Sequence, residues 1–569
     1  MSHKRLIVEG LNIDFGGRRV VHDVSFTLEP GTTLALVGES GSGKSVTARS
    51  LIGLAGAGAQ VSARTLSYGE HDLLSLGERQ WRDLRGQQIG FVLQDALVSL
   101  DPLRPVGKEI LEVLKTHRWG DRASRHARVM ELLERVGVPE PALRAHQRPD
   151  QLSGGLRQRA LIASALALDP GLVIADEPTT ALDATVQAQI LEVLQDIKAR
   201  GDSLLIISHD LAVVAQLADQ VLVLRHGKVV EQGPMEQVLR NPQHPYTRSL
   251  LDAVPAEHAR GTRLSPGSHG ERVPRPTADS PVLLQARDVA KRYVGPDQQS
   301  RQVVNGVSFE LRAGRTLGIV GESGSGKTTV ARIALGLLEP DGGSVMFLDQ
   351  PWSGGGPAQV PEAQRRLRRK DISVIYQDPL SSFDPRWSIG QILADALEVA
   401  GVPAVDHARQ VTRLLDQVRL PAELAARRPL QLSGGQRQRV AIARAIASNP
   451  RVIVCDEPVS ALDVSVQAQV LDLLADLQAE LGLAYLFISH DLGVIRHVSD
   501  EVLVMRHGQV VESAPVESLF EFPQHEYTRR LLGAVPRLPG AGVKLVVPAM
   551  EAENAVLIYD EQRLWKIAI

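Results

Sequence analysis

One loop pattern occurs twice in this chain of 569 residues and constrains its fold more than any other feature. The pattern G-x-x-x-x-G-K-[S/T] spans residues 38–45 (GESGSGKS) and again residues 321–328 (GESGSGKT). A short apolar run precedes each copy and a helix-forming stretch follows it, which predicts a buried strand, a tight loop and the opening of a helix. The chain is therefore expected to contain two phosphate-binding units of the α/β class.

Each residue type in the loop has a chemical task. Glycines let the backbone wrap closely around a polyphosphate, and backbone N–H groups at the helix start supply a positive field. Lys44 and Lys327 are expected to reach the β- and γ-phosphates, and the hydroxyls of Ser45 and Thr328 to bind Mg²⁺. An incidental Gly/Ser-rich loop is the alternative, which the matched duplication disfavours. The other predicted nucleotide-binding residues of the two loops are Gly38, Ser40, Gly41, Ser42, Gly43, Gly321, Ser323, Gly324, Ser325 and Gly326.

Other landmarks repeat at nearly the same offset as the loops. Lys44 and Lys327 lie 283 residues apart, and Asp176 and Asp456 lie 280 apart. Such constant spacing means two copies of one domain. We expect a first domain, a mobile Pro/Gly/Ser-rich linker without apolar periodicity, a second domain and a tail, at residues 1–254, 255–281, 282–537 and 538–569. In the tail, residues 543–547 and 555–559 are typical of strands, and no function is assigned to them.

Composition excludes several classes of function. The net charge of −3 provides no global basic field for nucleic acid. Cys455 is the single cysteine, which excludes an intramolecular disulfide and a four-cysteine metal site. No apolar run is long enough to span a bilayer, and the start lacks a signal-peptide core, so a cytoplasmic protein is expected. The basic run at residues 365–370 is interpreted as a solvated helix end rather than a nucleic-acid site.

A second apolar run ends in two carboxylates in each half. Asp176 and Glu177 follow one run, and Asp456 and Glu457 follow the other. Continuous apolar residues indicate a strand buried on both faces of a parallel sheet, whose carboxyl end is where such folds bind ligands. The aspartates are therefore expected to hold Mg²⁺, directly or through water, and the glutamates to polarise an attacking water. A polar turn before proline is the alternative, and the neighbouring phosphate loop disfavours it.

A serine and two glycines open an apolar helix in each half, at residues 152–158 (LSGGLRQ) and 432–438 (LSGGQRQ). Such a helix N-terminus also binds anions. Here the sequence resembles the ATP-binding cassette (ABC) family, whose signature motif is L-S-G-G-Q, and the motifs follow the family's order in both halves. The resemblance implies two tandem ABC-type P-loop NTPase cassettes, each a RecA-like core with a β subdomain plus a helical subdomain, with ATP and Mg²⁺ as cofactors.

The resemblance also implies that the cassettes pair head to tail within the chain. Each ATP would lie between one half's phosphate loop and the other half's signature, so residues 38–45 would face 433–437 and residues 321–328 would face 153–157. The signature residues implied to contact nucleotide are Ser153, Gly154, Gly155, Ser433, Gly434, Gly435 and Gln436.

Three further motif pairs match the family. Gln94 and Gln377 resemble the Q-loop glutamines, which sense Mg²⁺ and couple to a partner. Asp183 and Asp463, in Ala-Leu-Asp, match the D-loop. The remaining pair, in Ser-His-Asp, matches the switch histidine that contacts the γ-phosphate and comprises His209 and His490.

Two features leave alternatives open. Phe15 and Tyr293 precede the phosphate loops, where an aromatic side chain could stack on adenine or pack in the core, and spacing alone does not decide between them. Leu156 replaces the signature glutamine in the first half, so a polar contact is lost in the site built on Lys327. Because the other residues of that site are intact, we expect both sites to hydrolyse ATP, equally or unequally.

A narrower resemblance concerns residues 241–248 (NPQHPYTR), 522–529 (FPQHEYTR) and 377–386, which are similar to segments of oligopeptide/dipeptide importer ATPases. It implies a natural fusion of the two ATPase subunit types, acting with two integral-membrane permease subunits and, indirectly, an extracytoplasmic substrate-binding protein. The chain would be peripheral on the cytoplasmic face of the inner membrane. Peptide is the expected cargo, with nickel chelates or glutathione-like molecules as alternatives. The iron–sulfur cluster of some members is not expected here, because its cysteines are missing.

The main alternative is a soluble twin-cassette ATPase acting on ribosomes or nucleic acid. Such proteins usually carry a long charged helical arm between their cassettes, and residues 255–281 do not resemble one. An exporter motor is disfavoured by the HPYT-like segments. No nucleic-acid partner is therefore expected.

Overall fold

The structure is a computed structural model that describes residues 4–180, 182–265, 280–294, 299–536, 538, 555–560 and 563–568. The chain divides into two compact units, the first comprising Met1–Leu251 and Pro536–Ala541, the second Asp252–Val535 and Gly542–Ile569. This division agrees with the duplication seen in the sequence.

A six-stranded sheet, ordered β11-β10-β3-β9-β8-β7, forms the centre of the first unit. Its strand β3 leads into the phosphate loop, pairs in parallel with β9 and β10, and is buried along its whole length. Strands covered on both faces are uniformly apolar, which is why this run was recognisable. A second, antiparallel sheet has the order β2-β1-β5-β6, with β4 also paired to β1. The strands are β1 (Leu6–Phe15), β2 (Arg18–Leu28), β3 (Thr33–Val37), β4 (Ala59–Ser62), β5 (Thr65–Tyr68), β6 (His71–Asp72), β7 (Ile89–Val92), β8 (Leu172–Asp176), β9 (Ser203–Ile207), β10 (Gln220–Arg225) and β11 (Lys228–Pro234).

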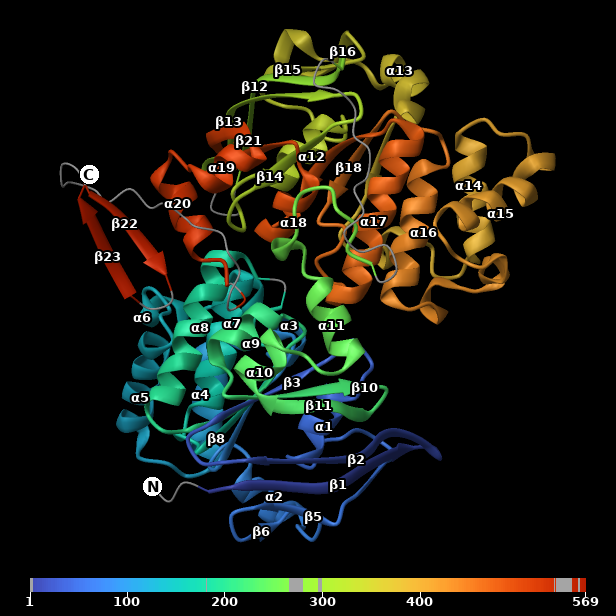
Figure 1. Cartoon of the computed structure of the whole chain (residues 1–569). Coiled ribbons are helices and arrows are strands. Elements are labelled where there is room, and N and C mark those ends of the chain that lie inside the picture. The colour runs from blue at the N-terminus through green and yellow to red at the C-terminus, as the bar shows by residue number, and fades with distance from the viewer. Residues whose placement is uncertain are drawn as a thin grey trace. The chain divides into compact units, whose positions relative to one another are not determined.

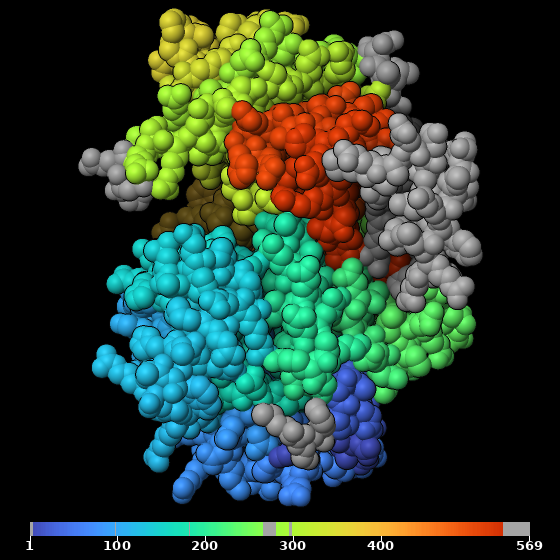
Figure 2. All heavy atoms as spheres, turned by 90° about the vertical axis from the view of Figure 1, so that its left-hand side faces the viewer, coloured from blue at the N-terminus to red at the C-terminus, as the bar shows by residue number. Residues whose placement is uncertain are grey.

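Helices α4, α5 and α7 contact one another and form a separate helical part of the first unit. In Figure 1 this part lies to one side of β1, β2 and β5. The space-filling view in Figure 2 shows the same division, with the helical part in cyan above the antiparallel-sheet part in blue. The helices are α1 (Lys44–Ser50), α2 (Glu78–Leu84), α3 (Ala96–Ser99), α4 (Val106–Thr116), α5 (Arg122–Arg135), α6 (Pro141–Arg144), η1 (Pro149–Gln151), α7 (Gly154–Ala165), α8 (Ala184–Ala199), α9 (Leu211–Leu217), α10 (Met235–Arg240) and α11 (Pro245–Asp252).

The second unit repeats this plan with sheets ordered β17-β18-β19-β14-β20-β21 and β13-β12-β15-β16. Helices α14, α15 and α16 contact one another at one end of the unit, away from β12, β15 and β16 (Figure 1). The strands are β12 (Val282–Val294), β13 (Ser300–Arg312), β14 (Thr316–Val320), β15 (Gly342–Phe347), β16 (Gln350–Gly354), β17 (Ile372–Ile375), β18 (Val452–Asp456), β19 (Ala484–Ile488), β20 (Glu501–Arg506) and β21 (Gln509–Pro515). The helices are η2 (Pro255–Glu257), α12 (Lys327–Ala334), η3 (Gly356–Ala358), α13 (Glu362–Arg365), η4 (Arg366–Asp371), η5 (Leu380–Ser382), α14 (Ile389–Val399), η6 (Ala404–Asp406), α15 (His407–Gln417), η7 (Ala422–Ala426), η8 (Pro429–Gln431), α16 (Gly434–Ile446), α17 (Val464–Leu481), α18 (Leu492–Val498), α19 (Val516–Glu521) and α20 (Glu526–Gly533).

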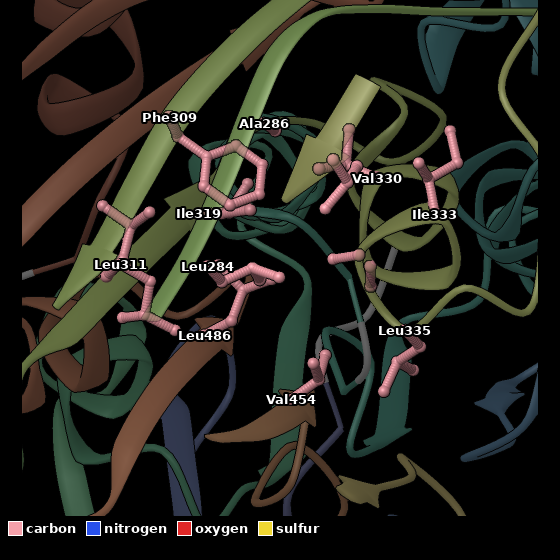
Figure 3. Close-up of a cluster of buried hydrophobic side chains, with 14 of the residues drawn as sticks. Leu284, Ala286, Phe309, Leu311, Ile319, Val330, Ile333, Leu335, Val454 and Leu486 are labelled. Atoms are coloured by element: carbon pink, nitrogen blue, oxygen red, sulfur yellow. The ribbon is translucent and has the colours of Figure 1, made fainter. Parts of the chain in front are cut away.

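The apolar core of the second unit joins its two sheets through α12. Figure 3 shows Phe309 of the antiparallel sheet, Val454 of the parallel sheet and Val330 of α12 within one cluster of buried side chains. Burying each such side chain contributes about 1.5–3 kcal/mol. Because α12 begins at the phosphate loop, this core holds that loop at the end of β14.

Residues 255–265 do not form the mobile linker expected there. The segment, which we call the anchored segment, packs on the second unit through η2 and α18, and Leu264 is completely buried. The backbone N–H groups of Leu264 and Ser265 donate to the two carboxylate oxygens of Asp472 at 3.0 and 2.9 Å. Arg260 pairs with Asp500. Arg263 pairs with Asp476, which follows Asp472 on α17. The expectation of mobility is wrong for this part because its partners lie about 200 residues further along the chain. Residues 266–279 lie outside the described residues.

The tail contains a hairpin of β22 (Ala555–Asp560) and β23 (Arg563–Ala568). The strand expected at residues 555–559 is confirmed by β22, and β23 was not predicted. The other expected strand, at residues 543–547, lies outside the described residues. Across the described ranges, no helix has the length and apolarity needed to cross a membrane.

Candidate functional site

The phosphate loop of the first unit closes around its own lysine. Lys44, the first residue of α1, reaches back so that its Nζ donates to the carbonyls of Gly38 at 2.6 Å and Glu39 at 2.8 Å. Gly43, just before the helix, has a left-handed φ of 98°. Glycine adopts this conformation without steric cost, so the loop can turn directly into the helix. In the second unit, Lys327 makes the corresponding bonds at 2.8 and 2.9 Å.

Two serine hydroxyls inside the loops suit phosphate oxygens. The Oγ atoms of Ser42 and Ser325 are buried and have no hydrogen-bond partner among the described residues. Leaving a buried polar atom unpaired costs free energy, so such atoms often mark a place for a ligand or water. The donor set of the two loops therefore fits a bound polyphosphate.

An oxygen pair lies beside each lysine, and it fits a magnesium ion. Ser45 Oγ donates to Asp176 Oδ1 at 2.9 Å, and Thr328 Oγ1 lies 3.5 Å from Asp456 Oδ1. Burial raises the pKa of both aspartates. In the first unit, Asp176 Oδ2 accepts no hydrogen bond from the described residues, and its cationic neighbour Arg49 is 3.8 Å away. Mg²⁺ prefers hydroxyl, carboxylate, phosphate and water oxygens, so each pair suits this ion. No cluster of three or more His, Cys, Asp or Glu side chains within the described ranges is placed to hold a metal.

Glu177 follows strand β8 in an unusual conformation. Its φ is 49°, in the left-handed region that residues other than glycine rarely adopt. Its N–H donates to the carbonyl of Ile207 on the neighbouring strand β9 at 2.9 Å. Gln94 Nε2 donates to Glu177 Oε2 at 2.8 Å, and His209 Nδ1 lies 3.4 Å from Oε1. Strain of this kind persists where the surroundings over-determine it, as they do at active sites.

Glu457 repeats this arrangement in the second unit. Its φ is 52°, and its N–H donates to the carbonyl of Ile488 at 3.0 Å. Gln377 Nε2 donates to Oε2 at 3.0 Å, and His490 Nδ1 lies 3.0 Å from the same oxygen. Glutamate, glutamine and histidine therefore meet twice at the carboxyl end of the parallel sheet.

The glutamate and histidine of each site shift each other's pKa. Burial raises the pKa of Glu177, but the hydrogen bond and charge of His209 outweigh it, so the pKa lies below its usual value. Burial lowers the pKa of His209, but the carboxylate of Glu177 outweighs it and the pKa is raised. Glu457 and His490 show the same directions. Each glutamate is therefore ionised at neutral pH, the form in which it can orient a water or accept its proton.

The signature residues lie at the start of α7 and α16. Ser153 caps α7 by accepting the N–H of Leu156 at 3.4 Å, and Ser433 accepts the N–H of Gln436 at 3.3 Å. A Cβ on Gly155 would collide with Val186 of α8, and Gly435 meets Val466 of α17 in the same way. These glycines are required because the two helices approach so closely.

Several predicted residues have local structural roles within their own units. The D-loop residues Asp183 and Asp463 cap α8 and α17 by accepting the N–H groups of Val186 and Val466. The structure thus places each signature beside the D-loop of its own unit. It places Lys44, Ser45, Gln94, Asp176, Glu177 and His209 around one phosphate loop, and Lys327, Thr328, Gln377, Asp456, Glu457 and His490 around the other.

The two aromatic candidates differ in their surroundings. Phe15 is partly buried and packs against the apolar core of the first unit. Tyr293 is 41% exposed at the end of β12. Tyr293 is thus the more accessible of the two for stacking on a base, and adenine contact stays a prediction for both.

The basic run at residues 365–370 lies at a helix end, as expected, but it is only partly solvated. Arg365 is only 6% exposed and donates to Glu362. Arg369 donates to Glu362 and to the carbonyls of Leu335 and Gly336. The guanidinium groups of Arg365 and Arg369 are thus occupied by the protein itself, whereas Arg366 and Lys370 are exposed.

Sequence reasoning missed two tyrosines that touch the loops. The hydroxyls of Tyr246 and Tyr527 accept the N–H groups of Glu39 and Glu322, each at 3.1 Å. The sequence marked both tyrosines only as part of a subfamily segment. No local pattern connects positions about 200 residues apart, so the contact itself could not be predicted.

Two family patterns match the chain, each of them twice. The pattern described as ABC transporter matches residues 21–180 and 304–460. The pattern described as the C-terminal region of oligopeptide/dipeptide transporters matches residues 230–278 and 511–555. The second pattern includes both tyrosines described above.

Full-length relatives agree with these matches. The chain is 45% identical over 555 residues to the peptidoglycan transport ATP-binding protein YejF of Agrobacterium fabrum, covering 95% of this chain and 98% of the relative. It is 42% identical over 586 residues to the glutathione import ATP-binding protein GsiA of Escherichia coli, covering 98% and 92%. Among solved structures, the archaeal ribosome recycling factor aABCE1, in complex with the ribosomal stalk protein aP1, has a TM-score of 0.57 at 21% identity and covers 86% of each chain. At that identity the likeness concerns the fold alone.

Proposed function

The chain belongs to the ABC transporter family, and from this premise we propose that it is the ATP-hydrolysing, energy-coupling subunit of an importer for peptides or peptide-like molecules. The observation that carries the proposal is the convergence, in each unit, of a phosphate-loop lysine, an ionised glutamate, a glutamine and a histidine at the end of one parallel sheet. This set can bind the phosphates, orient water and stabilise charge, which are the tasks that phosphoryl transfer requires.

We propose that the two units share their ATP sites. The loop at residues 38–45 would use the signature at 433–437, and the loop at 321–328 would use the one at 153–157. The helix start at each signature supports this role, because capped helix N-termini with glycines favour anions. Phe15 and Tyr293 are the proposed adenine contacts.

Each site would promote hydrolysis through charge and orientation. The lysines would hold the β- and γ-phosphates, and Glu177 or Glu457 would orient the attacking water and accept its proton. His209 and His490, held against those carboxylates, would contact the γ-phosphate. Bound Mg²⁺, held by Ser45 with Asp176 or by Thr328 with Asp456 and sensed by Gln94 or Gln377, would neutralise charge on the phosphates.

Exposed apolar side chains near each glutamine support a membrane partner. Val98 is 81% exposed and Leu103 is 75% exposed in the segment after Gln94. Trp387 is 39% exposed in the segment after Gln377. Apolar residues gathered on a surface are typical of protein interfaces. We propose that these two segments contact two integral-membrane permease subunits, which work with an extracytoplasmic substrate-binding protein.

The relatives' names suggest the cargo and the location. One is named for peptidoglycan transport and the other for glutathione import, and both cargoes contain peptide bonds. We propose a short peptide or a peptide-containing molecule as cargo. We also propose that the chain hydrolyses ATP at the cytoplasmic face of the inner membrane. The domain limits 1–254 and 282–537 are proposed as the two cassettes.

Cell fractionation tests this proposal. The full chain is expressed together with the two proposed permease subunits, and membranes and ribosomes are separated by sedimentation. We expect the chain in the membrane fraction, and ATP hydrolysis that rises when the permeases and a loaded binding protein are reconstituted with it. Co-sedimentation with ribosomes, without any response to the permeases, would replace this proposal with a ribosome-directed ATPase.

A further inference from the structure

The first peptide unit of the first phosphate loop is held at both of its polar ends. The carbonyl of Gly38 accepts a hydrogen bond from Lys44 Nζ at 2.6 Å. The N–H of Glu39, which belongs to the same peptide unit, donates to the hydroxyl of Tyr246 at 3.1 Å. Tyr246 lies on α11, near the end of the first unit and 207 residues from Glu39. A distant helix therefore grips the loop at the point where the loop begins.

The second unit repeats this contact. The carbonyl of Gly321 accepts from Lys327 Nζ at 2.8 Å, and the N–H of Glu322 donates to the hydroxyl of Tyr527 at 3.1 Å. The helices that carry the two tyrosines share five of their eight residues, PYTRSLLD in α11 and EYTRRLLG in α20. The contact is thus present in both copies of the domain.

Both tyrosines are themselves fixed in place. Tyr246 is 5% exposed, and the guanidinium of Arg225 lies over its ring at 4.7 Å. Its own N–H donates to His244 Nδ1 at 3.1 Å, and the N–H of His244 donates to Glu231 at 3.1 Å. Tyr527 is 2% exposed, and an arginine, Arg506, covers its ring at 4.9 Å. A hydroxyl held this firmly can fix the direction of the N–H that it accepts.

The direction of this peptide unit decides whether its carbonyl oxygen can hold the loop lysine. Gly38 has a φ of 149°, and a Cβ at this position would collide with the carbonyl oxygen of Leu224. Only glycine fits this position, and glycine also rotates most easily. If the peptide unit between Gly38 and Glu39 turned over, Lys44 Nζ would lose one of the two carbonyl oxygens that hold it.

We propose that Tyr246 and Tyr527 are positioning residues that hold the first peptide unit of each phosphate loop in the orientation that anchors the loop lysine. The family's C-terminal region would thus contribute to nucleotide affinity through the loop backbone. The inference rests on the proposed ATP sites. The tyrosines do not touch the nucleotide and act through the backbone of Glu39 and Glu322.

The test replaces each tyrosine by phenylalanine in the full chain. Tyr246→Phe and Tyr527→Phe remove one hydroxyl and keep the ring beneath its arginine. We expect the affinity for a fluorescent ATP analogue with Mg²⁺ to fall about 2- to 10-fold at the altered site, the worth of one hydrogen bond. The KM for ATP should rise more than kcat falls. The melting temperature should fall by no more than it does in a matched control, Tyr485→Phe. That variant also loses a buried hydroxyl, which donates to the carbonyl of Leu474 at 2.9 Å.

The outcomes separate this inference from the proposal it rests on. If the unaltered chain failed to bind the ATP analogue, the proposed ATP sites would be wrong. If the unaltered chain bound it and both phenylalanine variants bound it equally well, only the positioning role would be wrong. An affinity loss matched by Tyr485→Phe would also overturn that role, because it would reflect general destabilisation.

Discussion

The signature segments of the two cassettes begin their helices differently. In the second cassette, Ser433 and Gln436 cap each other, because the N–H of Ser433 donates to Gln436 Oε1 at 3.1 Å while Ser433 Oγ accepts from the N–H of Gln436. In the first cassette, Ser153 accepts from the N–H of Leu156, but a leucine side chain has no oxygen to accept a bond in return. The first signature therefore has one reciprocal bond fewer in its cap.

The oxygen pair beside the phosphate loop, in contrast, is closer in the first cassette than in the second. Ser45 donates to Asp176 at 2.9 Å, whereas Thr328 lies 3.5 Å from Asp456. Under the proposed trans pairing, the site built on Lys44 combines the tighter oxygen pair with the complete signature. The site built on Lys327 combines the looser pair with the leucine variant. Two differences on separate elements thus weaken the same proposed site.

Substituting the proposed catalytic glutamates tests whether both sites hydrolyse ATP. We expect Glu177→Gln and Glu457→Gln each to lower hydrolysis at its own site by about 100-fold or more, because general-base catalysis is lost there. Glu177→Gln should cost more of the total turnover, because the Lys44 site is the more complete one. Phosphate release by the two single variants and the double variant measures this. The view of two active sites would fail if one variant abolished turnover and the other had no effect.

Substitutions in the exposed apolar segments after Gln94 and Gln377 test whether the two cassettes bind different permease subunits. We expect the double variant Val98→Asp and Leu103→Asp to reduce co-purification with a permease subunit at least tenfold, because burying each side chain is worth about 1.5 kcal/mol or more. Trp387→Asp should act on the other permease. Val405→Asp is the control, because this valine is 90% exposed in η6 and away from both glutamine segments. Equal loss with the control would contradict specific docking.

The difference between Gln436 and Leu156 predicts a smaller effect on turnover. This effect also shows which signature acts on which phosphate loop. In the Glu457→Gln background, where the remaining hydrolysis comes from the Lys44 site, we expect Gln436→Leu to reduce turnover about fivefold, the worth of about 1 kcal/mol of capping. In the Glu177→Gln background, Leu156→Gln should raise turnover by a similar factor. Steady-state phosphate release measures both. If each substitution instead acted on the loop of its own cassette, the trans arrangement would be wrong.

Loosening the anchored segment is expected to change turnover least, and its effect is measured by hydrogen exchange. Asp472 on α17 receives two backbone N–H groups, whereas the corresponding residue of the first cassette, Glu192 on α8, is exposed. We expect Asp472→Ala to speed amide exchange at Leu264 and Ser265 at least tenfold, because bonds to a charged acceptor are worth about 1.5–3 kcal/mol. Hydrogen exchange with mass spectrometry measures this, and Glu192→Ala is the matched control. Unchanged exchange would mean that other contacts hold the segment.

Much of the site followed from local patterns. The phosphate loops, the Asp-Glu pairs and the Ser-Gly-Gly helix starts are short segments whose chemistry depends on residue type and spacing. Their strands were recognisable because a strand buried on both faces must be apolar throughout. The resemblance then supplied roles for Gln94, His209 and their counterparts, and the structure places these side chains against the glutamates.

Other features depend on contacts across long stretches of chain. The segment from Pro255 onward lacks periodicity and was interpreted as mobile, yet Asp472 anchors it. The basic run at residues 365–370 was interpreted as a solvated helix end, yet the guanidinium groups of Arg365 and Arg369 bind Glu362 and nearby carbonyls. In both cases the local pattern is ambiguous, because the residues that the segment contacts are not visible in the local sequence.

By itself the sequence determined that two copies of one nucleotide-binding domain are present, and it predicted which residues carry their chemistry, because that chemistry is expected in short, ordered motifs. Tertiary structure alone decided how those motifs are held. The left-handed backbone of each glutamate and the contacts of Tyr246 and Tyr527 with the loops arise only when strands and helices from distant parts of the chain pack together. Hydrogen bonds across about 200 residues have no local signature, because packing of the whole domain sets their geometry.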